Sequence, residues 1–396
     1  MKVLQVNNCD IPGRIFNGFD LHLALIEQGI DASQLVIDKY SDKKTVLELG
    51  INSLEREQII YLEEKYCVKN VLFPYAEKYL KKIEKGNYDI VHFHFPYHNM
   101  FSLLDYPRIM DSNSVWTIHD LWMLTGNCTH PLECSGWKYG CRDCNKYDDS
   151  YFPMKYNNVE FMWKLKKDIY SKTNPHIIVA SKYMEEFIRK SPLTCHFTNI
   201  HHIPFGIEIP DLKKRNNEKV VIGFRAEDAY IKGTYFLYKA LEGLVEISNK
   251  IELQCVGSGK VPEDIKKKFK TKSYGWINDK EAMNEIMQDW DIFIMPSLAE
   301  SFGLMAIEAM SYKCAVICFE NTAVADITCA PRYAVTASYA SSDDLMRKIK
   351  KLIDNKDIRL HYQFEGYEFV KKKYRFKDYV NKHIELYKEI SGEKNE

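Results

Sequence analysis

Short apolar segments alternate with longer amphipathic segments along this chain, and this alternation constrains the fold more than any other feature. Residues 2–6 (KVLQV) are typical of a buried strand and are followed, over 18–29, by apolar residues at helical spacing. Residues 176–181 (HIIVAS) and 182–191 (KYMEEFIRKS) repeat the order of strand and helix. Because strands joined by helical crossovers are parallel, the chain is predicted to be an α/β protein.

A break in this alternation lies at residues 202–219, where prolines, a glycine and a charged polar run indicate an interdomain linker. The alternation then starts again. We therefore predict two Rossmann-like doubly wound domains, over 1–205 and 206–375, that face each other across a cleft. Ligands of such sheets bind beyond the carboxyl ends of the strands. A last helix, within 376–396, is predicted to pack back towards the N-terminal domain.

Composition and charge exclude some classes of function. The 396 residues include 55 Lys plus Arg and 55 Asp plus Glu, and this balance gives no support for nucleic-acid binding. The N-terminus lacks the apolar stretch of a signal peptide, and no run approaches the length of a membrane span. A cytoplasmic protein is expected. Lys-rich helical segments at 78–86 and 164–172 would allow peripheral contact with the inner face of a membrane, although solvated charge is the simpler explanation.

Two carboxylates stand around a small segment in the second half of the chain. Glu300 and Glu308 lie in residues 296–317 (PSLAESFGLMAIEAMSYKCAVI), directly after a predicted strand. If a helix begins near Phe302, the free N–H groups at its start point towards an anion, and Gly303 leaves room for a ligand. The pattern suggests phosphate bound by backbone donors and hydroxyls bound by carboxylates, as in a sugar nucleotide. A plain helix start with acidic residues is the alternative.

Two cations follow another predicted strand of the same domain. Arg225 comes after the strand-like VVIGF, and Lys232 with Gly233 stands at a predicted helix entrance. An Arg fork and a Lys point charge at one edge of a sheet would neutralise a diphosphate. Ordinary surface cations are the alternative, which is weakened by the two carboxylates at the neighbouring strand end.

Histidines follow or occupy predicted strands of the first domain. His119 stands at a strand end, before Asp120 and between two tryptophans, which favours a shaped pocket. A hydrogen-bonded structural histidine is the common alternative. His92 and His94 point to one face of a strand, because alternate residues do. They would line an acceptor site or belong to the core.

Four cysteines crowd into a loop-like insert at 126–146, with the spacing C-x5-C-x6-C-x2-C. They are Cys128, Cys134, Cys141 and Cys144. Thiolates suit a tetrahedral zinc ion, and a Gly-rich and Pro-containing segment with little core would gain order from a metal. Structural zinc is the preferred interpretation, with His130 as a possible substitute ligand. Unliganded or redox-active thiols and disulfides are the alternatives. The insert is expected to form a lid or wall on the acceptor side.

The segment ESFGLMAIE resembles the E-x7-E signature of retaining glycosyltransferases of family 4, which have the GT-B fold. Four further segments are similar to elements of that family in the same order. They are PGRIFNGFDLHLALIEQGID with the glycine loop, WTIHD, the interdomain IPFGIE, and GFRAEDAYIKG. The resemblance covers nearly the whole chain.

The resemblance implies a role for each matching residue. The donor-binding set would be Gly13, Arg225, Lys232, Glu300, Ser301, Phe302, Gly303, Leu304 and Glu308. In it, Glu300 would contact hydroxyls of the donor sugar and Glu308 the ribose, while Arg225 and Lys232 would hold the diphosphate. His119 would face the sugar. Two features depart from the family pattern: the Arg-to-Lys spacing is wide, and one glycine stands at the first loop where many relatives carry a pair.

The function that the resemblance implies is retaining transfer of a sugar from a nucleotide-diphosphate sugar to a glycan or lipid-linked acceptor, in cell-surface polysaccharide synthesis of the bacterial type. The N-terminal domain would bind the acceptor and the C-terminal domain the sugar nucleotide. Front-face displacement without a catalytic divalent metal is expected. Two alternatives stay open: a sugar-nucleotide epimerase or hydrolase on the same fold, and a non-catalytic glycan-binding protein.

Overall fold

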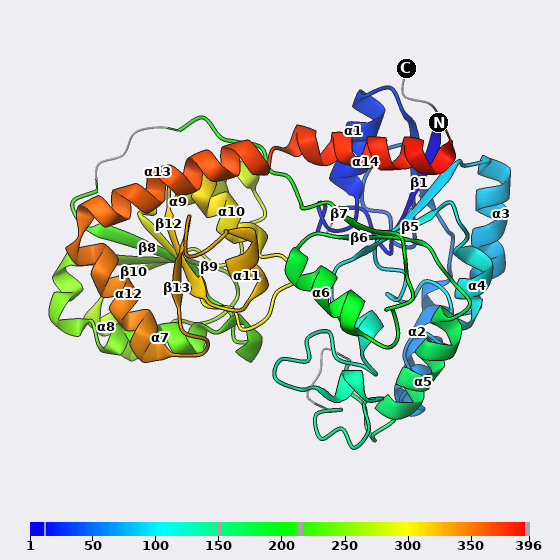
Figure 1. Ribbon diagram of the computed structural model, residues 1–396, viewed down its shortest axis with the longest axis horizontal. Coiled ribbons are helices and arrows are strands. Elements are labelled where there is room, and N and C mark those ends of the chain that lie inside the picture. The colour runs from blue at the N-terminus through cyan, green and yellow to red at the C-terminus, as the bar shows by residue number, and fades with distance from the viewer. Residues whose placement is uncertain (12, 149–151, 213–216, 393–396) are drawn as a thin grey trace. The chain divides into compact units, whose positions relative to one another are not determined.

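The computed structural model describes residues 1–396 except 12, 149–151, 213–216 and 393–396. The chain divides into two compact units (Figure 1). Unit 1 consists of Met1–Pro204 with Lys377–Glu396, and unit 2 of Phe205–Phe376. Each unit is built around one parallel sheet with helices as crossovers.

Unit 1 contains a seven-stranded sheet with the order β3-β2-β1-β4-β5-β6-β7, in which every pair of neighbours is parallel. The strands are β1 (Lys2–Val6), β2 (Asp31–Val36), β3 (Val46–Glu48), β4 (Ile90–Phe93), β5 (Ser114–Ile118), β6 (His176–Val179) and β7 (Ile200–His202). Strands β4 and β5 are buried along their whole length, as expected for parallel strands covered on both faces.

Two helices of unit 1 begin directly after residues whose side chains cap them. The helices of this unit are α1 (Phe19–Glu27), α2 (Ser53–Lys65), α3 (Ala76–Gly86), α4 (Tyr106–Ile109), α5 (Val159–Tyr170), α6 (Lys182–Lys190) and α14 (Phe376–Ser391). The side chain of Asn52 accepts a hydrogen bond from the amide of Glu55 and so caps α2. Ser181 caps α6 through the amide of Met184 in the same way.

Aromatic side chains dominate the core of unit 1. Tyr79 lies 5.8 Å from Phe93, and Tyr106 lies 5.7 Å from Trp116, between ring centroids. All four side chains are essentially inaccessible to water. Since each such ring buries roughly 150–250 Å², these contacts supply much of the apolar surface that stabilises the unit.

Unit 2 contains a six-stranded parallel sheet with the order β10-β9-β8-β11-β12-β13. Its strands are β8 (Val220–Arg225), β9 (Ile251–Val256), β10 (Lys270–Ser273), β11 (Ile292–Met295), β12 (Ala315–Phe319) and β13 (Val335–Ala337). Its helices are α7 (Thr234–Glu242), α8 (Glu263–Lys268), α9 (Lys280–Asp289), α10 (Leu304–Ser311), α11 (Ala323–Ile327), α12 (Ser342–Asp354) and α13 (Lys356–Lys373).

Both sheets reverse their winding direction beside their first strand. In unit 1 the chain proceeds from β1 outwards to β3 and then returns to β4 on the other side of β1. In unit 2 it proceeds from β8 to β10 and returns to β11. Loops leaving such a pair of strands diverge, and ligands of doubly wound sheets bind there. The predicted α/β class with two doubly wound parallel sheets is confirmed; the cleft between the domains stays a prediction.

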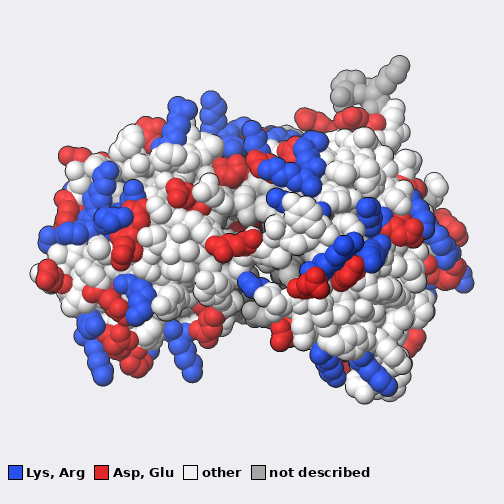
Figure 2. Space-filling view, turned by 60° about the horizontal axis from the view of Figure 1, so that its bottom comes forward, with Lys and Arg blue, Asp and Glu red and all other residues white. Residues whose placement is uncertain are grey.

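The surface carries charges of both signs. On the face shown in Figure 2, Lys and Arg are interspersed with Asp and Glu over the described residues. Within the described part of the chain, none of the helices combines the length and apolar character that crossing a membrane requires.

Gly223 in the middle of β8 provides a test of how tightly unit 2 is packed. A Cβ at this position would lie 2.0 Å from Cδ2 of Trp290, which is buried and stacked on Phe293 at 5.3 Å. Gly223→Ala is therefore expected to destabilise the protein by about 1–3 kcal/mol through overpacking. Urea unfolding measures this loss. In the Trp290→Leu background the same change should cost much less, so equal costs in both backgrounds would contradict the packing argument.

Candidate active site

The predicted donor residues of unit 2 lie at the carboxyl ends of neighbouring strands. Arg225 is the last residue of β8, and Glu300 follows β11, the strand that pairs with β8 on the other side of the switch point. Lys232 lies in a short 3-10 helix, Tyr230–Lys232, that leads into α7. The loops after β8 and β11 therefore meet where the topology predicts a ligand site.

Lys232 and Glu300 are in direct contact. The ammonium Nζ lies 2.7 Å from Oε1 of Glu300, and both side chains are largely withdrawn from water, at 24% and 15% exposure. The hydroxyl of Ser297 donates to the same oxygen at 3.1 Å. The structure thus brings together two residues that are 68 positions apart and that the sequence assigned to one site.

Gly233 allows this contact to form. Its backbone is left-handed, with φ +69°, and a Cβ would lie 1.7 Å from the carbonyl oxygen of Pro296. The neighbouring backbone is also joined, because the amide of Leu298 donates to the carbonyl of Ile231 at 2.8 Å. The loop that carries Lys232 is therefore packed directly on the loop that carries Glu300.

Arg225 contacts residues that the sequence did not identify. Its guanidinium lies 3.2 Å from Oε2 of Glu227 and 5.2 Å from the ring centroid of Trp276. Ser258 donates to the other oxygen of Glu227 at 3.1 Å. The ring of Trp276 is 59% exposed, which is unusual for tryptophan and leaves a flat face open beside a cation. An aromatic residue in the segment between β10 and α9 was the only signal for it.

The start of α10 offers backbone donors, whereas its aromatic residue is structural. Phe302 is fully buried and packs edge-on against Phe205 and Tyr374, with ring centroids at 5.3 and 5.9 Å. Gly303 precedes the helix with φ +98°. The first amides of a helix have no partner within it, so those of Gly303 and Leu304 can serve an anion.

Glu308 lies in the second turn of α10 and has an unusual acidity. Its side chain is only partly accessible, and burial raises the pKa of its carboxyl to about 7, while the charge of Lys280 acts in the opposite direction. The carboxylate and the neutral acid are therefore close in free energy near neutral pH. Such perturbed groups are frequent at functional sites.

His119 and Asp120 follow β5 in unit 1. His119 is 7% exposed and stacks on Phe95 at 4.4 Å, and burial lowers the pKa of its imidazole to about 3. Asp120 accepts hydrogen bonds from the hydroxyl of Tyr97 at 2.7 Å and from the amide of Trp122 at 2.8 Å. Burial nevertheless raises the pKa of Asp120 to about 6. His119 is thus a neutral ring, and Asp120 shapes the turn after it.

Lys166 supports the same turn from α5. Its ammonium donates to the carbonyls of Trp122 and Thr125 at 2.7 and 3.0 Å and lies 3.2 Å from the ring centroid of Trp122. The sequence placed this lysine in an exposed basic patch, and that expectation is wrong, because the side chain is completely buried. Burial holds its pKa well below the ordinary value for lysine.

Gly13 lies in the loop between β1 and α1. Its φ is +71°, the residue is exposed, and a Cβ would meet no atom within 4 Å. The amides of Phe16 and Asn17 donate to its carbonyl and hold the turn. The position therefore requires glycine for its backbone conformation.

The predicted zinc site finds no support in the structure. Among the described residues, which include all four cysteines, no three potential ligand side chains are arranged to hold a metal ion, and the cysteines are not joined as disulfides. Cys141 and Cys134 instead accept hydrogen bonds from the amides of Gly126 and Gly136. The insert also has a core that its composition did not suggest, because Trp137 is buried.

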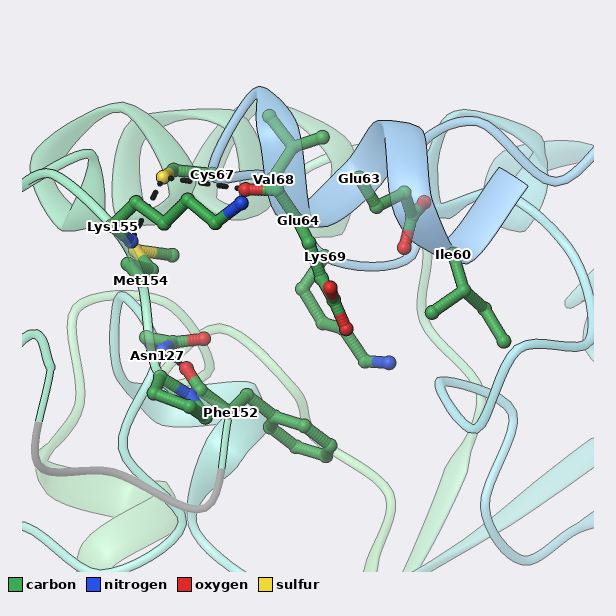
Figure 3. Close-up of a pocket in the computed structure, with 11 residues that line it drawn as sticks. Ile60, Glu63, Glu64, Cys67, Val68, Lys69, Asn127, Phe152, Met154 and Lys155 are labelled. Atoms are coloured by element: carbon green, nitrogen blue, oxygen red, sulfur yellow. Dashed lines mark hydrogen bonds between the residues drawn. The ribbon is translucent and has the colours of Figure 1, made fainter. Parts of the chain in front are cut away.

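A cavity in unit 1 was not anticipated from the sequence. It has a volume of about 360 Å³ and lies beside α2 (Figure 3). Glu64, Lys69 and Phe152 extend into the same space. The ammonium of Lys69 lies 4.6 Å from the ring centroid of Phe152 and donates to Asn99 at 2.7 Å. Burial lowers the pKa of Lys69.

Comparison with known families decides the identity of the chain. The profile of Glycosyltransferase Family 4 matches residues 24–209, and that of Glycosyl transferases group 1 matches residues 219–355. The chain belongs to glycosyltransferase family 4. The resemblance seen in the sequence is therefore confirmed. The two profiles meet near the predicted linker, so each covers one of the α/β regions.

The curated relatives of the chain are distant. The chain is 24% identical over 232 residues to WcaC of Escherichia coli (strain K12), whose name provisionally describes a colanic acid biosynthesis glycosyl transferase. It is 25% identical over 129 residues to EpsF of Bacillus subtilis (strain 168), provisionally named a glycosyltransferase. The matched region covers 55% of this chain and 54% of WcaC, so the chain spans about half the length of that relative.

Solved structures show that the chain has the GT-B fold. Sucrose-phosphate synthase from Thermosynechococcus elongatus matches with a TM-score of 0.69 and 15% identity, with complete coverage of both chains. HepE from Anabaena, in complex with UDP and glucose, matches with a TM-score of 0.63 and 13% identity, covering 98% of this chain and 99% of its own. At these identities the likeness establishes the fold.

Gly233→Ala tests the contact between the two loops of unit 2. The added methyl group would collide with the carbonyl of Pro296, and the left-handed backbone would be strained, so stability should fall by more than about 1 kcal/mol. Urea unfolding measures this change. Gly243→Ala is the matched control, because its nearest neighbour would be the flexible side chain of Met346, at 3.1 Å, and its φ of −75° suits any residue. Equal losses of stability in the two variants would contradict the close packing of the Lys232 loop on the Glu300 loop.

Glu308 makes the stability of unit 2 depend on pH. Its pKa is raised in the folded state, so its contribution to stability is complete below the ordinary carboxyl pKa, about 4.5, and is lost as the pH rises through about 7. Relative to Glu308→Gln, the wild type should lose roughly 1 kcal/mol across this window, less than the shift alone implies because water reaches part of the side chain. Urea unfolding of both proteins at several pH values measures the difference. A constant difference would refute the assigned pKa.

Proposed function

We propose that the protein transfers a sugar from a nucleoside-diphosphate sugar to a glycan or lipid-linked acceptor, with retention of anomeric configuration. The observation that carries this proposal is the contact between Lys232 and Glu300 at the switch point of unit 2. An ammonium for phosphate oxygens and a carboxylate for sugar hydroxyls stand side by side there. Together with the amides at the start of α10, they suit both halves of such a donor.

The charges in unit 2 explain how the leaving group would be stabilised. As the bond from the anomeric carbon to phosphate breaks, negative charge grows on the diphosphate, and fixed donors aimed at it lower the barrier. Lys232 and Arg225 would supply these donors. Each cation is paired with a carboxylate, Arg225 with Glu227 and Lys232 with Glu300. Donor binding would exchange these pairs for phosphate contacts and release Glu300 to accept hydrogen bonds from the sugar.

The nucleoside would be bound by residues on either side of this pair. Glu308 in its carboxylate form would accept hydrogen bonds from the two ribose hydroxyls, and the exposed face of Trp276 suits a base. HepE was solved with UDP and glucose, which supports UDP as the nucleotide to test first. The name of WcaC, which refers to colanic acid biosynthesis, supports a role in bacterial cell-surface polysaccharide synthesis.

Transfer would proceed on one face of the sugar. The bond to the leaving phosphate breaks, the acceptor oxygen bonds to the anomeric carbon from the same side, and the hydroxyl proton moves to a phosphate oxygen. Neutral His119 would contact the donor sugar and would not act as the general base. Protein cations would take the part that a divalent metal plays in other transferases.

Unit 1 would bind the acceptor. If the acceptor is lipid-linked, this unit has to approach a membrane surface. Helix α3 exposes several lysines, while Tyr79 on its other face is buried. Such a helix favours contact with anionic lipid headgroups.

A panel of sugar nucleotides, each incubated with and without a lipid-linked acceptor, tests the proposed function. Nucleotide release that depends on the acceptor supports transfer. Turnover without an acceptor would indicate the epimerase or hydrolase alternative, and binding without turnover would indicate a glycan-binding protein. Inversion at the anomeric carbon of the product would exclude front-face displacement.

Lys232→Met is expected to reduce kcat/KM about 100-fold or more, because one fixed donor to the leaving group is lost. Nucleotide release in the acceptor-dependent assay measures this effect. Lys239→Met is the control, since Lys239 lies on α7 a short distance away and pairs with Glu242 at the exposed surface. Similar values of kcat/KM for the two variants would show that Lys232 does not act in the catalytic site.

A further inference from the structure

A row of buried polar side chains crosses the centre of the sheet of unit 1. Gln5 on β1 lies directly opposite His92 on β4 in the strand register. His94 follows His92 on the same face, and His119 lies just beyond the end of β5. Burying polar groups in the middle of a parallel sheet lowers the stability of the fold unless every one is hydrogen-bonded, so each of these side chains should have a hydrogen-bond partner.

Hydrogen bonds link these residues into one chain that reaches the C-terminal helix. Nε2 of His119 lies 3.3 Å from Nδ1 of His94, and Nε2 of His94 lies 2.7 Å from Oε1 of Gln5. Nε2 of Gln5 donates to the hydroxyl of Tyr387, on α14, at 3.1 Å. That hydroxyl lies 2.6 Å from Nδ1 of His92. At the far end, Nε2 of His92 lies 2.7 Å from the hydroxyl of a threonine on β5.

The orientation of the Gln5 amide assigns every proton in this chain. Because Oε1 can only accept, Nε2 of His94 must donate to it, and Nδ1 of His94 then carries a lone pair. Nε2 of His119 therefore donates to His94, and Nδ1 of His119 carries the lone pair. On the other side, the hydroxyl of Tyr387 accepts from Gln5 and donates to Nδ1 of His92.

Gln5 is the member of the chain that sets the direction. An imidazole can exchange its N–H between two nitrogens and a hydroxyl can rotate, but the two ends of an amide are chemically different. Turning the amide over would reverse each bond and place the proton of His119 on Nδ1. Burial supports the neutral rings that this order requires, because it lowers the pKa of His94 and of His119 far below the ordinary value.

The surrounding residues hold the rings in place. A Cβ on Gly18 would lie 2.1 Å from Nε2 of His94, so the glycine lets the start of α1 pack directly on that ring. Nδ1 of His383, one turn before Tyr387 on α14, donates to the carbonyl of Tyr379 at 2.8 Å. The His383 ring stacks on His92 at 5.7 Å. Helix α14 therefore supplies hydrogen bonds through Tyr387, and a packing surface through His383, to these linked side chains.

We infer that Gln5 and Tyr387 are positioning residues that fix the tautomer of His119, so that this ring offers a lone pair on Nδ1 to a hydroxyl of the donor sugar. The assignment of the tautomer stands on the hydrogen-bond chain alone, whereas its use for a sugar hydroxyl rests on the proposed function. A ring fixed in this way favours a sugar with a hydroxyl at this place, which can donate a hydrogen bond, over a sugar whose group at the same place cannot donate one.

Long-range ¹H–¹⁵N correlation spectra of protein labelled with ¹⁵N-histidine distinguish the two neutral tautomers and test the assignment. The signals of His119 are identified by their loss in His119→Asn. The wild type should show the Nε2–H form. Gln5→Met removes the amide, and Tyr387→Phe removes the hydroxyl that accepts a hydrogen bond from it. Each variant should therefore give a mixture of tautomers. Tyr379→Phe, a change of the same kind on the same helix, should not.

Turnover gives a second readout, with the donor that is active in the assay above and its monodeoxy analogues. Gln5→Met and Tyr387→Phe should lower kcat/KM for the parent donor about tenfold, the value of one uncharged hydrogen bond. Neither variant should change kcat/KM for the one deoxy analogue that lacks the hydroxyl bound by His119. Melting temperatures of all variants identify any that fail to fold. An Nδ1–H form in the wild type, or an unchanged tautomer in both variants, would overturn the inference. An absence of turnover with the expected spectra would count against the proposed function and leave the tautomer assignment intact.

Discussion

Burial of both faces of each parallel sheet is the constraint on which the rest of this structure depends. Strands β4, β5 and β12 are inaccessible to water along their whole length. Most of the candidate site residues therefore lie where the strands end, after β1 and β5 in unit 1 and after β8 and β11 in unit 2. The chain arrives at this arrangement twice, with His119 and Gly13 in one unit and Lys232 with Glu300 in the other.

Much of this organisation could be predicted from the sequence, because it rests on local periodicity. The alternation of strands and helices indicated two parallel sheets, and the spacing of Glu300 and Glu308 indicated a site after a buried strand. The pairing of Lys232 with Glu300 was also within reach, since residues at the carboxyl ends of adjacent strands meet at one edge. The exact partners were not, because they depend on loop conformations that periodicity does not describe.

What sequence reasoning missed has one physical cause, which is contact between residues far apart in the chain. Lys166 was assigned to a basic surface, yet carbonyls of Trp122 and Thr125 converge on its ammonium and make its burial tolerable. The burial of Trp137 in the cysteine insert is not visible in a composition rich in small and polar residues. The contact of Arg225 with Trp276, which comes from another loop, was likewise not foreseen.

The bond between Gln5 and Tyr387 joins positions that are 382 residues apart. On the ribosome, the amino-terminal half of the chain is complete long before the helix that covers its sheet has been made. The face that carries Gln5 and His92 must therefore stay exposed to water, or to a chaperone, until α14 has been made. Assembly of the first unit thus waits for the whole of the second unit to be synthesised, and chains that stop before α14 leave the first unit without its cover.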